Sequence, residues 1–156
     1  MRLAAAIRIV TGVLFIAEGY SKVTGEFVHG GFAKAAVRMS HEAWPFWGRF
    51  LQTVVVPHAG PLGWAFALGE LAVGIGLLLG LWTRVACAGG LVLMASILLA
   101  DARPEKGAGW TDWVTAGLTP KFAFLLLLLL MAADAGRVWG MDGSLSKRRR
   151  PAARLS

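Results

Sequence analysis

The sequence is poor in the residues that build disulfides and metal centres. It contains a single cysteine, Cys87, so neither an internal disulfide nor a C-x-x-C redox pair can form within it. The three histidines, His29, His41 and His58, all fall between two apolar runs, and no apolar run contains one. We therefore expect no haem held by histidines between helices, and the irregular spacing of the histidines predicts no metal site.

Charge is also scarce. Of the 156 residues, 16% are charged and 56% are hydrophobic, whereas about 25% of the residues of a soluble domain are charged. Four apolar runs each approach the ~17–25 residues that cross a bilayer. We predict an all-α membrane protein, a four-transmembrane-helix bundle over residues 1–145, with helices at roughly 3–22, 61–82, 84–101 and 120–140.

The basic residues predict an orientation. The net charge of +7 comes largely from residues 146–156, which we expect to be a disordered tail. Arg2 and Arg84 flank other helix ends, and the positive-inside rule then places both termini in the cytoplasm. We interpret the tail as a topology anchor on anionic lipid, and no nucleic-acid partner is expected.

The segment between the first two helices, residues 23–60, is too long for a simple connection. Apolar residues recur at helical spacing from Phe32 to Ser40, and a run rich in aromatics follows Trp44. We predict one or two short helices lying flat on the outer membrane face. They form either an interfacial cap or a lid over a lipid-accessible site. In the second case the aromatic residues bordering a quinone ring or an acyl tail are Trp44, Trp47, Phe50 and Trp64.

Glu70 is the only charged residue of its apolar run. A carboxylate at that depth costs at least ~2.5 kcal/mol on insertion scales, so it must face a partner or a cavity. On a helical wheel Glu70 shares its face with Gly63, Ala67 and Gly74, which predicts a face in contact with another helix. The spacing of Gly76 and Gly80 indicates a second close contact.

The first helix supplies candidate partners for Glu70. Arg8, Thr11, Glu18 and Lys22 lie within a wedge of about 80° that must face the bundle interior. Depth along the helices predicts two clusters. Glu18, Lys22 and Glu70 form the outer one, and Arg8, Asp134 and Arg137 form the inner one. Both can be structural ion pairs that set helix register, and the outer one can instead exchange protons at a quinone headgroup, which makes its three residues the candidate catalytic set.

Three motifs carry a family resemblance. The first is Ile7-Arg8 with the stretch from Phe15 to Lys22, and the second is the segment from Gly69-Glu70-Leu71 to Thr83-Arg84. The third is Ala135-Gly136-Arg137 followed by Asp142. Together they resemble the DoxX/DoxD family. The resemblance implies a four-helix protein of the cytoplasmic (inner) membrane of a bacterium or archaeon. DoxD is the small membrane subunit of thiosulfate:quinone oxidoreductase.

Two functions follow from the resemblance. One is a redox subunit in which Glu70, Glu18 and Lys22 line a pocket for quinone as substrate, with thiosulfate or a related donor. The other is a non-catalytic anchor or scaffold of a respiratory, photosynthetic or oxidative-stress complex. No bound cofactor is visible in the sequence, and whether the chain is itself an enzyme stays open. The expected partners are lipid, a DoxA-like or soluble oxidoreductase subunit, and a second copy of the chain.

Overall fold

Four long helices form the body of the molecule. The computed structural model describes residues 2–101 and 118–132, and each element within those ranges is a helix. The long helices are α1 (Arg2–Thr24), α4 (Ala59–Leu79), α5 (Thr83–Asp101) and α7 (Leu118–Ala132). The first three are long and apolar enough to cross a membrane, and α7 is shorter. This confirms the predicted all-α membrane bundle, while the predicted continuation to residue 140 lies outside the described residues.

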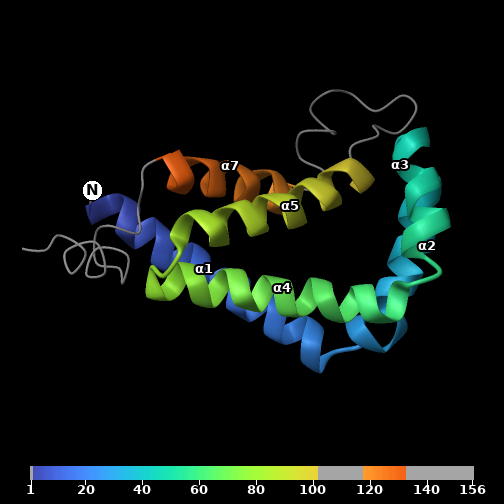
Figure 1. The fold of residues 1–156 in the computed structure, drawn as a ribbon, viewed down its shortest axis with the longest axis horizontal. Helices are drawn as coiled ribbons and strands as arrows, with labels where there is room; N and C mark the ends of the chain where they lie inside the picture. Colours follow the sequence, from blue (N-terminus) through green and yellow to red (C-terminus); the bar gives the residue numbers. More distant parts are fainter. Residues whose placement is uncertain (1, 102–117, 133–156) are drawn as a thin grey trace, which may run out of the picture.

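The helices pack as two pairs. α1 lies along α4, α5 lies along α7, and α4 contacts α5 next to the turn that joins them. Figure 1 shows α4 and α5 meeting at this turn and diverging towards their other ends. An apolar core fills the bundle and includes Leu77, Leu127 and the fully buried thiol of Cys87.

Short helices lie across the open end of the bundle, and we call residues 27–55 the outer arm. It consists of η1 (Phe27–Gly31), α2 (Phe32–Glu42), α3 (Pro45–Phe50) and η2 (Leu51–Val55). α3 begins with Pro45 in its first turn, where proline is favourable, and continues into η2 with helical backbone angles. Figure 1 shows the arm crosswise to the bundle, as expected for helices that lie flat on a membrane face.

α1 and α4 approach so closely that only glycine fits at positions 12 and 74. A Cβ atom on Gly74 would lie 2.7 Å from the backbone nitrogen of Ile16, and one on Gly12 would lie 2.7 Å from that of Leu78. Gly63, Ala67, Glu70 and Gly74 are all buried, so the predicted contact face of α4 is confirmed.

The second glycine pair differs from the prediction. Gly76 does pack closely, because a Cβ there would lie 3.0 Å from that of Ala86 on α5. Gly80 instead ends α4 in the left-handed conformation, with φ +62°, and the Leu81 N–H donates to the Gly76 carbonyl over 3.0 Å. This C-terminal cap stops α4 at Leu79, three residues before the predicted end.

Candidate functional site

Arg8 and Thr11 of the polar stripe on α1 face the bundle interior as predicted, whereas Glu18, which was predicted to face it too, is exposed. Arg8 is fully buried and Thr11 is 2% exposed. The Thr11 hydroxyl donates to the Ile7 carbonyl over 2.8 Å, which satisfies it within its own helix. Lys22 occupies the last turn of α1, and its long side chain reaches Glu70 on α4.

Lys22 and Glu70 form the central ion pair of the site. The Lys22 Nζ donates to Glu70 Oε2 over 2.6 Å, and Glu18 Oε2 lies 3.5 Å from the same nitrogen. The Glu70 side chain is 3% exposed, that of Lys22 19% and that of Glu18 68%. The structure therefore brings the three predicted residues of the outer cluster together, with one buried and one exposed carboxylate beside the ammonium.

Aromatic rings surround the other side of the ammonium. The Lys22 Nζ lies 5.7 Å from the ring centroid of Phe27 and 5.9 Å from that of Phe66, within the range of cation–π attraction. The ring centroid of Phe32 lies 5.4 Å from that of Phe27 and 6.2 Å from that of Phe66, so the three rings form one group. Attraction to a ring face is worth ~0.5–2 kcal/mol, and here it holds Lys22 between the rings and the carboxylates.

A cavity of about 530 Å³, which we call the aromatic cavity, opens beside these rings between the outer arm, α4 and α5. Lys22 is the only charged residue among the described residues that line it. Phe32, Ala35, Ala36 and Met39 all line it, so the apolar face predicted for α2 is turned into this cavity. The site therefore combines one cation with an apolar, ring-lined space large enough for a drug-sized molecule.

A second cavity of about 300 Å³ lies on the carboxylate side, and we call it the acidic cavity. Glu18 and Glu70 both line it, together with Thr11 and residues of α5 and α7. Lys22 lines both cavities, so the Lys22–Glu70 pair stands at the boundary between them.

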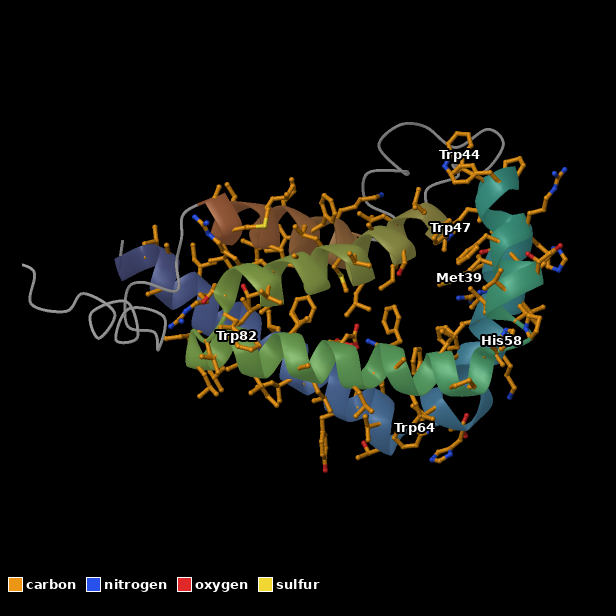
Figure 2. All side chains as sticks on the ribbon, viewed as in Figure 1. Met39, Trp44, Trp47, His58, Trp64 and Trp82 are labelled. Carbon is orange, nitrogen blue, oxygen red and sulfur yellow. The ribbon has the colours of Figure 1, made fainter. Side chains whose placement is uncertain are left out.

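The four aromatic residues predicted to border a ligand divide into two groups. Trp47 and Phe50 line the aromatic cavity, whereas Trp44 and Trp64 do not. Trp44 precedes α3 and is 43% exposed, and Trp64 stands edge-on to His29 with ring centroids 6.3 Å apart. Figure 2 shows Trp47 beside Met39 on the inner side of the arm and Trp64 on the opposite side of α4.

Two rings of the site were not singled out from the sequence. Phe66 lies one turn before Glu70 on α4, so the i, i+4 spacing on the Glu70 face is the signal that finds it. Phe27 has no such signal, because its position depends on the path of the chain after α1. Gly25 and Glu26 connect α1 to Phe27, and a bend just after Phe27, at His29 and at Gly30 with φ +117°, sets the direction of the outer arm.

The inner cluster stays a prediction. Arg8 is fully buried, but Asp134 and Arg137, its predicted companions, lie outside the described residues. In residues 2–101 and 118–132, no three or more His, Cys, Asp or Glu side chains gather as a metal site. His29, His41 and His58 are all exposed.

These features define a class, an all-helical membrane protein with a buried ion pair at the wall of an apolar cavity that a capping arm covers. The DoxX family profile matches residues 3–100, which contain the outer arm and every residue of the ion-pair cluster. This chain belongs to the DoxX family. Neither a curated protein nor a solved structure matches it.

Proposed function

We propose that this protein is the quinone-binding membrane subunit of a redox system. The observation that carries the proposal is the Lys22–Glu70 pair at the wall of the aromatic cavity. A quinone has a planar ring with two carbonyl oxygens and an apolar tail. The Lys22 ammonium fits a carbonyl oxygen, and the rings of Phe27 and Phe66 fit the faces or edges of the quinone ring.

The chemistry of such a site is proton-coupled reduction. Quinone takes up two electrons and two protons to become quinol, and the electrons come from a donor such as thiosulfate that a DoxA-like or soluble oxidoreductase partner oxidises. Lys22 donates a hydrogen bond to the carbonyl oxygen that gains negative charge and passes a proton to it. Glu70 holds the ammonium in place and stabilises it in the low dielectric of the membrane.

A second candidate function is a non-catalytic anchor. The same ion pair joins α1 to α4 on the face where Gly12 and Gly74 already bring the two backbones into contact. A buried pair that fixes helix register has this geometry as well. The two functions differ in whether the aromatic cavity takes a quinone, and binding therefore separates them.

Quinone binding is measured by tryptophan fluorescence of the full chain in lipid nanodiscs, titrated with decylubiquinone and with a short-chain menaquinone. We expect saturable quenching, because Trp47 lines the aromatic cavity. Trp47→Phe is expected to remove most of the saturable quenching. Trp64→Phe is the matched control and is expected to keep it, because Trp64 lies outside the cavity.

The role of the cation is measured by Lys22→Gln, which keeps a neutral hydrogen-bond donor. A hydrogen bond to a charged group is worth ~1.5–3 kcal/mol, so binding is expected to weaken about 10- to 150-fold. Absence of saturable quenching by either quinone in the wild-type protein would reject the redox proposal and favour the anchor.

A further inference from the structure

The acidic cavity connects the exposed Glu18 with the buried Glu70. Its rim includes Leu14 on α1 and Phe122 on α7, which are 56% and 60% exposed. Its lining also includes Thr11 and Phe15, which are 2% and 6% exposed. The cavity therefore extends from an exposed rim, where Glu18 lies, to buried walls that include Glu70.

The charges of this cavity are unbalanced. Two carboxylates, Glu18 and Glu70, flank the single ammonium of Lys22, at 3.5 Å and 2.6 Å. The other lining residues in the described part of the chain are uncharged: Thr11, Leu14 and Phe15 from α1, Met94 and Ile97 from α5, and Phe122, Ala123 and Leu126 from α7. The other described charged residues of the bundle nearby, Arg8 on α1 and Lys121 on α7, do not line the cavity. The three charged groups carry a formal charge of −1, and one added proton neutralises them.

Most residues that line the cavity are apolar, but the part lined by Thr11, Glu18, Lys22 and Glu70 suits water. At about 30 Å³ per molecule in the liquid, a cavity of about 300 Å³ has room for several waters. The hydroxyl oxygen of Thr11, the two carboxylates and the ammonium provide the two to four polar partners that a buried water needs. Glu18 lies six residues before Thr24, the end of α1 next to the outer arm, which is ~9 Å along the helix. Protons from the water at that end of the bundle can then reach Glu18 without crossing the aromatic cavity.

We propose that Glu18 is the proton-exchange group that recharges Lys22 during quinone reduction and that the acidic cavity is its water-filled supply route. This inference rests on the proposed function. The Lys22 ammonium gives one proton to the reduced quinone oxygen and becomes a neutral amine. Protonated Glu18 then gives its proton to that amine, which restores the ammonium and the Glu18 carboxylate. Glu18 takes the next proton from water in the cavity, and a second round completes the quinol.

The two sides of Lys22 thus have separate tasks. The aromatic cavity takes the quinone, and the acidic cavity delivers its protons. Glu18 touches no quinone in this arrangement and acts only through Lys22, since it lines only the acidic cavity.

The test uses Glu18→Gln in the full chain, with decylubiquinone bound in nanodiscs on an electrode. The electrode supplies the electrons, so no partner subunit is needed. We expect quinone binding by fluorescence quenching to equal that of the wild type. Reduction of the bound quinone is expected to slow at least ~10-fold at neutral pH, as for loss of a general acid, and its rate is expected to follow the proton concentration.

Three further measurements separate proton delivery from a structural role. Glu42→Gln removes an exposed carboxylate on α2 that lines neither cavity, and its rate and pH profile are expected to match the wild type. Glu18→Asp is expected to restore most of the rate. Added formic acid or hydrazoic acid, each small enough for the acidic cavity, is expected to speed the Glu18→Gln protein and not the wild type.

Each outcome decides the inference. If the Glu18→Gln protein binds quinone and reduces it with the rate and pH profile of the wild type, Glu18 does not deliver protons. That result would overturn this inference and would not contradict the quinone site. Loss of quinone binding in Glu18→Gln would also overturn it, because Glu18 would then be needed to hold the site. If the wild type binds no quinone, the proposed function fails and this inference fails with it.

Discussion

The ammonium of Lys22 and the carboxylate of Glu70 meet over 2.6 Å, although the two residues are 48 positions apart in the chain. One belongs to the last turn of α1 and the other to the middle of α4. Their pair joins α1 to α4, whose backbones approach closely at Gly12 and Gly74, and Lys22 lines both cavities. A change in this pair therefore alters helix packing and ligand binding together, and single substitutions need matched controls.

The first prediction concerns the stability that depends on the pair. Lys22→Met removes the partner of a carboxylate that is 3% exposed and leaves its charge buried. We expect the free energy of unfolding to fall by ~3–5 kcal/mol, which is typical when one member of a buried pair is removed. Thermal unfolding in mild detergent, followed by circular dichroism, measures the change.

Two variants serve as controls for this effect. Glu18→Gln is expected to change stability by less than ~1 kcal/mol, since the Glu18 side chain is 68% exposed. The double variant Lys22→Met/Glu70→Leu removes both charges and is expected to recover most of the loss. A double variant no more stable than Lys22→Met would show that packing, and not the unpaired charge, causes the loss.

The sequence predicted the cluster of Glu18, Lys22 and Glu70 that contains this pair, because helical periodicity is a local property. Wheel positions and rise per residue place Glu18, Lys22 and Glu70 in the outer half of the bundle, and burial of charge in lipid requires a partner. The end of α4 was predicted less well, because glycines at i and i+4 are typical both of helix contacts and of a left-handed cap. Gly80 shows that the cap prevails here.

The aromatic residues show where sequence reasoning stops. Trp47 in α3 and Trp64 in the first half of α4 have the same chemistry, yet only Trp47 lines the aromatic cavity. The difference depends on the direction of the outer arm, which is set by the bend at Gly30 and by contacts between the arm and α4 and α5. Such long-range geometry is absent from a periodicity argument.

The second prediction tests the contact between α1 and α4. Gly74→Ala places a methyl group 2.7 Å from the Ile16 backbone nitrogen, and neither backbone can yield without moving a helix. We expect a loss of ~1–3 kcal/mol in the free energy of unfolding, as for an overpacked core. Gly69→Ala is the control on the same helix, because its methyl group would meet Leu93 at an ordinary 3.5 Å. Equal melting temperatures for the two variants would contradict the close contact.

The third prediction concerns the turn between α4 and α5. Gly80 has a φ of +62°, where a side chain is strained by ~1–2 kcal/mol, and we expect Gly80→Ala to be destabilised by that amount. The control is Gly89→Ala on α5, which meets Val73 at 3.6 Å and is expected to gain up to ~1 kcal/mol of helix propensity. Thermal unfolding of both variants is the measurement, and a stabilised Gly80→Ala would contradict the cap.

The fourth prediction asks whether the aromatic cavity is the binding space. Ala35 on α2 lines the cavity, and its neighbour Ala33 on the same helix is also partly buried but does not line it. Ala35→Phe places a ring in the space that a quinone ring would occupy, and we expect the affinity for decylubiquinone to fall at least ~10-fold, a loss of ~1.4 kcal/mol. Ala33→Phe adds the same ring elsewhere on α2 and is expected to leave the affinity within about twofold of the wild type. The fluorescence titration in nanodiscs measures both, with thermal unfolding to show that each variant is folded. If Ala35→Phe binds as tightly as Ala33→Phe, the quinone does not occupy this cavity.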